Sequence, residues 1–512
     1  MALVLGFSFA VSAERKKSSE ATDNIQQQEL KNLPPPLPRE FRAAWVATIA
    51  NIDWPSKPGL SSGMQQEEFI QILNRAVELK LNALVMQVRP QCDAFYASKI
   101  EPWSPYLNGK MGKPPEPFYD PLEFAVTESH KRGIELHAWF NPFRANKKSK
   151  NYPLSENHVS KVHPEIVRDY GTHLWLDPGE PAAREYSAVV ILDVVKRYDI
   201  DGIHFDDYFY PYKEKDEEKK LIPFPDDQSF QKYTDAGGKL NRSDWRRDNV
   251  NQFIEMVHAS VKKMKPWVKV GAAPFGIWRP GYPAGVKGMD PYEELACDSR
   301  KWLQQGWLDY VAPQLYWRTE APAQPFVPLL KWWVEQNTLG RNIWPGHFDS
   351  EIGDKDAKTG EPKMTTEDII SQILLTRKEP GASGNIHYSM KALMNNRGKV
   401  SDRLAAEVYT APAVIPASPW LNATAPAKPK LSTKKRKGEM KIGWKAARSE
   451  KIFVWALQKK NGADWSLEIL PADQKFVVIN IDPTSKPPEA VALTAVNRYG
   501  TASAPAVLEI KP

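Results

Sequence analysis

Two adjacent carboxylates, Asp206 and Asp207, end a short apolar segment with the sequence DGIHFDDY at residues 201–208. Carboxyl groups are costly to hold beside an apolar strand unless they bind a partner. Aromatic residues follow at once, at Tyr208, Phe209, Tyr210 and Tyr212. Carboxyl groups handle protons and positive charge, and aromatic rings pack on the apolar faces of pyranoses, so the pattern predicts a sugar-cleaving site. The alternative is structural: both carboxylates cap the next turn or pair with nearby arginines.

The elements that would position these acids alternate along the chain up to about Val408. Eight buried strands are predicted from short apolar runs with β-branched or aromatic residues, at Arg42–Ile49, Ala83–Arg89, Ile134–Phe140, Gly202–Asp206, Val268–Pro274, Tyr310–Tyr316, Asn342–Gly346 and Asn385–Ser389. Helices are predicted between and after them, at Gln66–Lys80, Ala182–Tyr198, Trp245–Lys265, Pro291–Gln305, Val327–Gln336, Glu367–Lys378 and Ser401–Val408. Such alternation means parallel strands with helical crossovers.

The alternation of predicted strands and helices ends at Tyr409, and the composition of the chain changes there. Residues 410–437 are rich in Ala, Pro and Lys, which predicts a linker. Short strand-like runs then follow to Asn497, and their spacing predicts a small β-sandwich over residues 438–512. The run Ala492–Asn497 before a tight turn resembles a fibronectin type III module.

The expected fold class is therefore α/β: a (β/α)8 TIM barrel over residues 39–409 with a small C-terminal all-β, fibronectin type III-like domain. A doubly wound open sheet is the alternative. It is weakened because no glycine-rich phosphate loop opens an early helix.

The chain starts with a short apolar segment, residues 1–13, which ends Val11-Ser-Ala13 like the cleavage site of a secretory signal. A disordered tail is the alternative. Residues 14–38 are polar and then proline-rich, and predict a disordered tether. We therefore expect an exported protein, periplasmic or extracellular, without an integral membrane span. Cys92 and Cys297 could pair in an oxidising compartment.

Composition limits the partners. The chain carries a net charge of +7, and basic runs such as Lys434–Lys437 account for part of it. A polyanion partner is possible on charge alone, either nucleic acid or an acidic glycan. No nucleic-acid-binding motif is recognisable, so a glycan is the expected partner.

In a barrel, function gathers at the carboxyl ends of the strands. The acids expected there to be catalytic are Asp206, Asp207 and Glu320. The residues expected to bind substrate are Trp45, Gln87, Arg89, Asp93, His137, Trp139, Asn141, Arg144, His204, Tyr208, Trp278, Arg279, Gln314, Tyr316 and Trp317. The single histidines lack His-x-His or His-Glu-x-x-His spacing, so neither a metal nor a cofactor is expected. No Gly-x-Ser-x-Gly elbow directly follows a predicted strand, so hydrolysis by a Ser-His-Asp triad is not expected.

Ordered motifs from about Arg39 to Ser389 resemble those of the glycosyl-hydrolase-like family 10 proteins. They are FRAAWV (41–46), QVRP (87–90), HAWFNP (137–142), WLDPG (175–179), DGIHFDDY (201–208), SDWRRDN (243–249), PFGIWR (274–279) and PQLYW (313–317). The resemblance implies a TIM barrel and an exported, envelope-associated glycosidase. It also implies activity on peptidoglycan strands freed of stem peptides.

Adjacent acids at the fourth strand also look like the pairs in hexosaminidases of glycoside hydrolase families 20 and 84, whose nucleophile is the substrate's own acetamido group. By that analogy Asp206 orients the acetamido group and Asp207 is the general acid. Tyr316 would bond the acetamido oxygen, and Trp278, Trp317 or Trp139 would form the sugar platform.

Two other hypotheses remain. In the first, the protein is a retaining glycosidase of another polysaccharide, in which one fourth-strand Asp is the nucleophile and Glu320 or Asp93 is the acid. Alternatively, the protein binds carbohydrate and never cleaves it.

Overall fold

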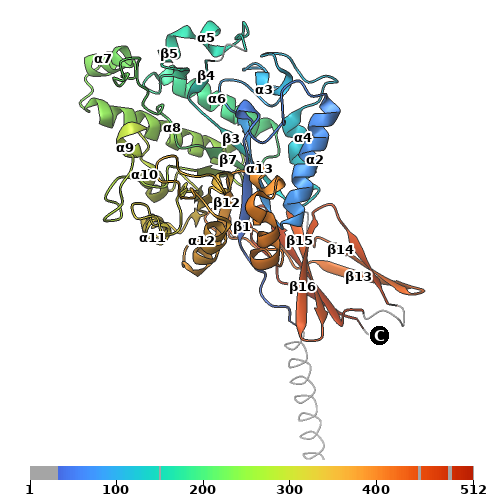
Figure 1. The fold of residues 1–512 in the computed structure, drawn as a ribbon. Coiled ribbons are helices and arrows are strands. Elements are labelled where there is room, and N and C mark those ends of the chain that lie inside the picture. The colour runs from blue at the N-terminus through green and yellow to red at the C-terminus, as the bar shows by residue number, and fades with distance from the viewer. Residues whose placement is uncertain (1–32, 149–151, 448–450, 482–486, 511–512) are drawn as a thin grey trace, which may run out of the picture. The chain divides into compact units, whose positions relative to one another are not determined.

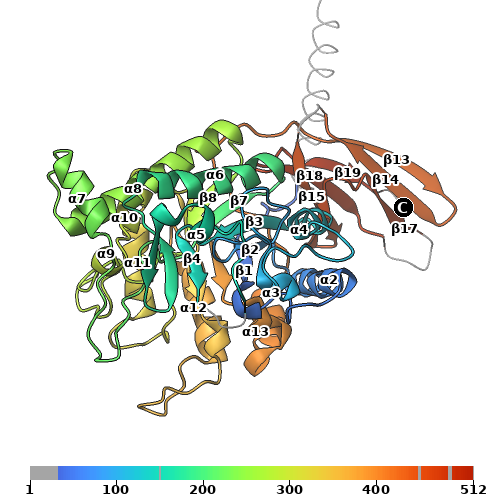
Figure 2. The same ribbon diagram turned by 90° about the horizontal axis from the view of Figure 1, so that it is seen from above.

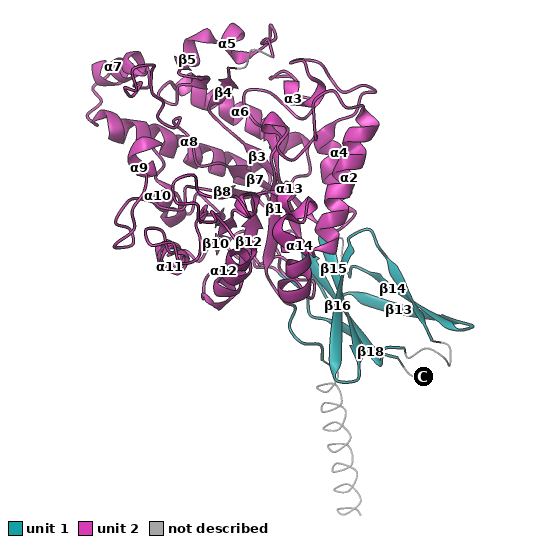
Figure 3. Ribbon diagram, viewed as in Figure 1, with its two compact units in different colours: residues 1–37, 425–497, 502–512 teal, residues 38–424, 498–501 magenta. Residues whose placement is uncertain are grey.

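The structure is a computed structural model that describes residues 33–148, 152–447, 451–481 and 487–510. The predicted signal segment, residues 1–13, and most of the predicted tether lie outside the described residues. The chain divides into two compact units, one of residues 38–424 and 498–501 and one that includes residues 425–497 and 502–512 (Figure 3).

The larger unit is a closed (β/α)8 barrel (Figures 1 and 2). Its parallel strands are β1 (Phe41–Val46), β2 (Ala83–Arg89), β3 (Glu135–Phe140), β7 (Gly202–Phe205), β8 (Lys269–Ala272), β9 (Tyr310–Val311), β10 (Asn342–Ile343), β11 (Gly346–His347) and β12 (Gly384–His387). Each pairs with the next except β10 and β11, and β1 pairs with both β2 and β12. β10 pairs with β9, while β11, only two residues further on, pairs with β12. These two short segments are therefore one strand, and they close the ring. A strand overlaps each of the eight predicted ranges, although the sixth is only Tyr310–Val311.

Helices surround this ring of strands (Figures 1 and 2). They are α2 (Ser62–Glu78), α3 (Pro105–Asn108), α4 (Pro121–His130), α5 (Val159–Val162), α6 (Pro181–Arg197), α7 (Asp227–Asp235), α8 (Arg242–Met264), α9 (Pro291–Glu294), α10 (Ser299–Gln304), α11 (Phe326–Gln336), α12 (Thr366–Lys378), α13 (Met390–Met394) and α14 (Val400–Arg403). Local capping explains several starts. Ser61 accepts from the Met64 amide at the start of α2, and Thr365 forms a capping box with Asp368 at the start of α12.

One predicted helix, Pro291–Gln305, is two helices in the structure, α9 and α10. Ala296 between them has a φ of 53°, a left-handed conformation that interrupts a helix. Asp298 then caps the second helix by accepting from the Lys301 amide.

The barrel interior has its own core, separate from the larger core between strands and helices. Large rings such as Trp45 and Trp139 fill it beside small residues such as Ala273. Gly346 belongs to the same level, because a Cβ there would lie 2.8 Å from the Trp45 ring and 3.2 Å from Tyr316. Small and large residues thus interlock directly below the carboxyl ends of the strands.

An insertion between β3 and β7 forms a small antiparallel sheet of β4 (Arg144–Lys147), β5 (Val167–Tyr170) and β6 (His173–Leu176). Trp175 on β6 donates to the Phe209 carbonyl at 2.9 Å, and its ring lies 6.0 Å from that of Tyr208. The insertion therefore supports the segment that follows the acidic pair.

The smaller unit is all-β. Its two antiparallel sheets contain β13 (Lys430–Arg436), β14 (Glu439–Lys445) and β17 (Phe476–Asn480), and β15 (Ile452–Asn461), β16 (Asp464–Pro471), β18 (Ala490–Asn497) and β19 (Ala506–Glu509). Apolar residues of both sheets, including Trp444 and Trp455, form one core. β13 begins inside residues 410–437, the predicted linker. The likeness to fibronectin type III stays a prediction.

No helix in the described part of the chain combines the length and the apolar character needed to cross a bilayer.

Candidate active site

Asp206 directly follows β7 and lies at the mouth of the barrel, partly exposed. Its Oδ2 accepts from Asn141 Nδ2 at 3.2 Å, and its Oδ1 accepts from Gln314 Nε2 at 3.3 Å. The Asp207 amide also donates to Oδ1, at 2.9 Å. Donors from three strand ends thus hold this carboxylate in one orientation. A side chain that binds a ligand needs such a fixed orientation.

Asp207 is in a different environment, with only 3% of its surface exposed. The Tyr212 hydroxyl donates to its Oδ2. Burial and the negative charge of Asp206 raise the pKa of the Asp207 carboxyl well above its usual range. Among the described residues, neither acid takes part in a salt bridge, so the structural reading in which arginines pair with them is not supported.

Asn141 is the hub of the polar groups around the pair. Its Oδ1 accepts from Gln87 Nε2 at 2.6 Å, and its Nδ2 also donates to the Tyr208 hydroxyl at 2.9 Å. Arg144 donates to Asn141 Oδ1 at 3.3 Å and lies over the Tyr208 ring, 5.1 Å from its centroid. Of the predicted substrate-binding residues, the structure therefore brings together Gln87, Asn141, Arg144, Tyr208 and Gln314 around Asp206.

The indole N–H of Trp139 has no acceptor among the described residues, although the residue is only 5% exposed. A buried donor without a partner is costly, at about 1–3 kcal/mol, and usually marks a place where a water or ligand oxygen binds. Trp139 precedes Asn141 by two residues and shares its side of β3. The unpaired N–H thus lies just beneath the side chains that donate hydrogen bonds to Asp206.

A chain of hydrogen bonds runs down the barrel interior from Trp45. The Trp45 indole donates to His204 Nε2 at 3.0 Å, so His204 must carry its proton on Nδ1, which donates to the Tyr310 hydroxyl at 3.0 Å. Burial lowers the pKa of His204 well below its usual value, in keeping with a neutral ring.

The chain continues because the Tyr310 hydroxyl then donates to His137 Nδ1 at 2.9 Å, and His137 Nε2 donates to Glu135 at 3.0 Å. Lys269 closes it with an ion pair to Glu135 at 2.7 Å. His137 and His204, predicted to bind substrate, are both completely buried. The structure places them below the mouth, where they support Trp45.

Replacing Tyr310 by Phe tests this network. The change leaves the Nδ1–H of His204 without an acceptor and His137 Nδ1 without a donor, and we expect the free energy of unfolding to fall by about 1–3 kcal/mol. Tyr282→Phe is the matched control, because Tyr282 is 48% exposed. Urea denaturation of both variants measures the difference, and equal stability of the Tyr310 variant and the wild type would contradict the network.

Arg89 and Asp93 also lie away from the mouth. Arg89 is fully buried and forms two hydrogen bonds to Glu101, at 2.6 and 2.8 Å, and two to the carbonyls of Asn141 and Pro142. Asp93 is fully buried nearby, and burial raises its pKa to about 6. These residues fix the loop after β2 rather than face a substrate.

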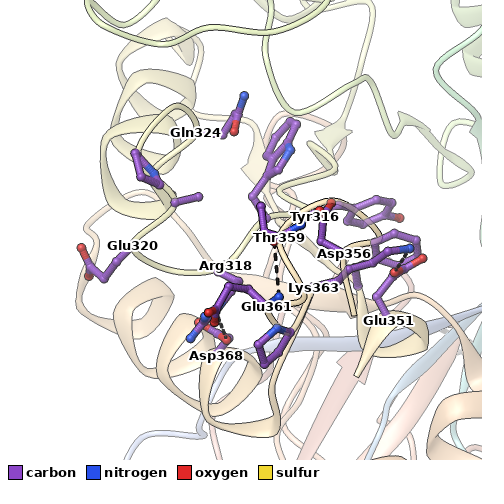
Figure 4. A pocket seen from close by; sticks show the side chains of 15 residues that line it. Tyr316, Arg318, Glu320, Gln324, Glu351, Asp356, Thr359, Glu361, Lys363 and Asp368 are labelled. Atoms are coloured by element: carbon purple, nitrogen blue, oxygen red, sulfur yellow. Dashed lines mark hydrogen bonds and ion pairs between the residues drawn. The ribbon is translucent and has the colours of Figure 1, made fainter. Parts of the chain in front are cut away.

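Tyr316 connects the mouth to a cleft of about 800 Å³ between the loops that follow β9 and β11 (Figure 4). Its ring stacks on Phe348 with centroids 4.6 Å apart and lies 5.9 Å from the ring of Tyr388. Burial raises the pKa of Tyr316 well above its usual range, and the neighbouring Tyr388, Asp206 and Asp207 add to that shift.

The cleft also contains Trp317 and Glu320. Glu320 is exposed and lies on the other side of the cleft from Tyr316 (Figure 4). The structure therefore does not bring Glu320 to the acidic pair. Trp278 stacks on Trp332 of α11, and Arg279 pairs with Asp290 at 3.0 Å, so these two predicted residues belong to the loop after β8.

Three side chains that shape this site were not among the predicted site residues: Tyr212, the partner of Asp207, and the neighbouring rings Phe348 and Tyr388. Tyr212 stood in the aromatic run after the acids, and Phe348 and Tyr388 each directly follow a strand-end histidine. Tyr388 lies inside the eighth predicted strand, and Phe348 lies two residues beyond the seventh. No group of three or more His, Cys, Asp or Glu side chains in the described residues is arranged to hold a metal.

This arrangement can protonate a leaving group from Asp207 while Asp206 binds a polar or cationic group beside it.

Residues 40–355 match the model of a family described as glycosyl hydrolase-like 10. Glycosyl hydrolase YngK of Bacillus subtilis is 41% identical over 402 residues, 77% of this chain and 76% of that protein. Glycosyl hydrolase DigH of Escherichia coli K12 is 36% identical over 377 residues, 68% of this chain and 82% of that protein. The PgaB (BpsB) glycoside hydrolase domain from Bordetella bronchiseptica aligns with a TM-score of 0.48 at 16% identity, covering 72% of this chain and 98% of that chain.

Proposed function

Because this chain belongs to the glycosyl hydrolase-like 10 family, we propose that it hydrolyses glycosidic bonds in a bacterial envelope glycan. The proposed substrates are N-acetylated peptidoglycan strands that carry no stem peptides. The observation that supports this most is the pair Asp206 and Asp207, whose environments differ. One carboxylate faces the mouth among hydrogen-bond donors, and the other is buried with a raised pKa.

In the proposed reaction Asp207 gives its proton to the glycosidic oxygen as the bond to the anomeric carbon breaks. The acetamido oxygen of the same sugar attacks that carbon and forms a cyclic oxazolinium intermediate. Asp206 accepts a hydrogen bond from the acetamido N–H and offsets the positive charge. Water then attacks the anomeric carbon, gives a proton to Asp207, and restores the acetamido group.

The surrounding groups suit an acetamido sugar. Tyr316 lines the cleft beside the mouth, and in this proposal its hydroxyl donates to the acetamido oxygen. The Trp139 indole supplies a buried donor that still lacks an acceptor. The retaining alternative is less well supported, since Asp93 is buried behind the mouth and Glu320 lies across the cleft. Export is proposed with this function, on the signal-like segment at residues 1–13.

The pH dependence follows from the state of Asp207. A general acid works only when protonated, so activity should fall as the pH rises through the raised pKa of Asp207. The Tyr212 hydroxyl stabilises the carboxylate and lowers that pKa, so Tyr212→Phe should move the alkaline limb of kcat/KM to higher pH. Tyr282→Phe should leave the limb in place. A limb that moves to lower pH in Tyr212→Phe would rule out Asp207 as the acid.

Digestion of purified peptide-free glycan strands, with mass analysis of the products, tests the function itself. We expect shorter saccharides that have each gained one water. The same strands after chemical removal of the acetyl groups should resist cleavage, because they lack the internal nucleophile. Equal cleavage of both polymers would refute the substrate-assisted scheme, and no product from either would refute the function.

A further inference from the structure

The three-stranded sheet of the smaller unit has one face turned away from its core. Along β14 buried residues alternate with exposed or half-buried ones, so Met440, Ile442 and Trp444 face inward. The registers with β13 and β17 then define the outer face. We call it the basic face, and its residues are Lys430, Ser432, Lys434, Arg436, Glu439, Lys441, Gly443, Lys445, Phe476, Val478 and Asn480.

Like charges lie opposite one another on the basic face and destabilise the sheet. Lys434 lies directly opposite Lys441, and Lys430 lies directly opposite Lys445. Like charges in directly opposed positions repel and destabilise a sheet. Glu439 is the only acid among the residues of the face, and it lies opposite Arg436. A bound anion would turn this repulsion into attraction.

An exposed aromatic ring lies among these cations. Phe476 is 45% exposed, and its neighbour on β17, Val478, is 50% exposed. The Lys441 ammonium lies over the Phe476 ring, 3.4 Å from its centroid. Lys434, Arg436 and Lys441 line a hollow of about 250 Å³ together with both apolar residues and one acid, Glu439. The face therefore offers cations and an apolar ring within one concave surface.

From this arrangement we propose that the basic face binds an anionic polysaccharide, a glycan with carboxylates repeated along its chain. The opposed lysines would pair with successive carboxylates, and Phe476 would pack on the apolar face of a sugar ring. The choice of a polysaccharide over other polyanions rests on the proposed function, since a module that holds envelope glycan would raise the local concentration of substrate for the barrel.

Binding of the full-length chain to polygalacturonate, a carboxylated polysaccharide without acetamido groups, tests this inference independently of turnover. We expect binding at low salt that weakens as salt rises. Lys434→Gln/Lys441→Gln should weaken it about tenfold by removing one opposed pair. Phe476→Ala should weaken it about fivefold with little change in the salt dependence. Neutral dextran should not bind.

The matched control is Lys196→Gln/Lys331→Gln, which removes two exposed charges from α6 and α11 and should bind like the wild type. Thermal melts check folding, and relief of repulsion should leave Lys434→Gln/Lys441→Gln at least as stable as the wild type. Undiminished binding by that variant, or equal loss in the control, would overturn the proposal. Tighter binding to duplex DNA or to phosphatidylglycerol vesicles than to polygalacturonate would overturn it too. Failure to cleave any glycan would refute the proposed function and leave this binding result intact.

Discussion

Asp207→Asn should lower kcat on peptide-free glycan strands about a thousandfold, because an amide cannot protonate the glycosidic oxygen. Asn has nearly the same shape and can still accept from Tyr212, the partner of Asp207 in the structure. The loss therefore reports on the proton alone. Asp235→Asn, an exposed position on α7, is the matched control and should keep full activity.

An aryl glycoside of N-acetylglucosamine with an acidic phenol as leaving group sharpens this test. Such a leaving group departs without a proton, so the loss in Asp207→Asn should shrink to within about tenfold of the wild type. An equal loss on both substrates would mean that the residue has a role other than proton donation.

The stability of Asp207→Asn provides a check on folding. The pKa of Asp207 is raised in the folded state, so the contribution of this group to stability is present at low pH and is lost as the pH rises through the folded-state pKa. Asn does not titrate. We therefore expect the melting temperature of the variant to exceed that of the wild type at alkaline pH.

Asp206→Ala should also lower kcat about a thousandfold, but an activated leaving group should not restore it. In the proposed reaction Asp206 orients the acetamido group and offsets positive charge, and both effects are needed before any leaving group departs. The donors Asn141 and Gln314 remain in place in this variant, so its fold should persist.

Sodium azide distinguishes the two enzymatic schemes in Asp206→Ala. If Asp206 were a covalent nucleophile, azide would occupy the vacated space, attack the anomeric carbon and give a glycosyl azide at a restored rate. The acetamido scheme predicts no rescue, because the internal nucleophile is still present and only its orientation is lost. Formation of glycosyl azide would replace the scheme proposed here by a retaining one.

The barrel strands could be predicted from the sequence because each is a short apolar run between turn signals, as at Ala83–Arg89. The acidic pair could be found because it directly follows such a run. What each strand-end residue faces could not be predicted. The alternation of β2 suggests that Arg89 shares the side of Gln87, but the register with β3 shifts between these two residues. That irregularity accompanies the burial of Arg89 against Glu101.

The cleft residues illustrate a second limit. Phe348 and the polar loop 353–363 meet Tyr316 only because β9 and β11 are neighbours in the closed ring. Contacts between loops depend on strand order in space, which the sequence of a single chain does not state. The buried N–H of Trp139 is a further example, since a missing partner becomes visible only when every neighbour is placed.

The most direct test is a crystal structure of Asp207→Asn with an N-acetylated peptidoglycan tetrasaccharide. The account predicts that a sugar lies at the barrel mouth with its glycosidic oxygen in hydrogen-bonding distance of residue 207 and its acetamido N–H on Asp206. The acetamido oxygen would accept from Tyr316. An oligosaccharide bound elsewhere, with both strand-end carboxyl positions out of its reach, would contradict the account.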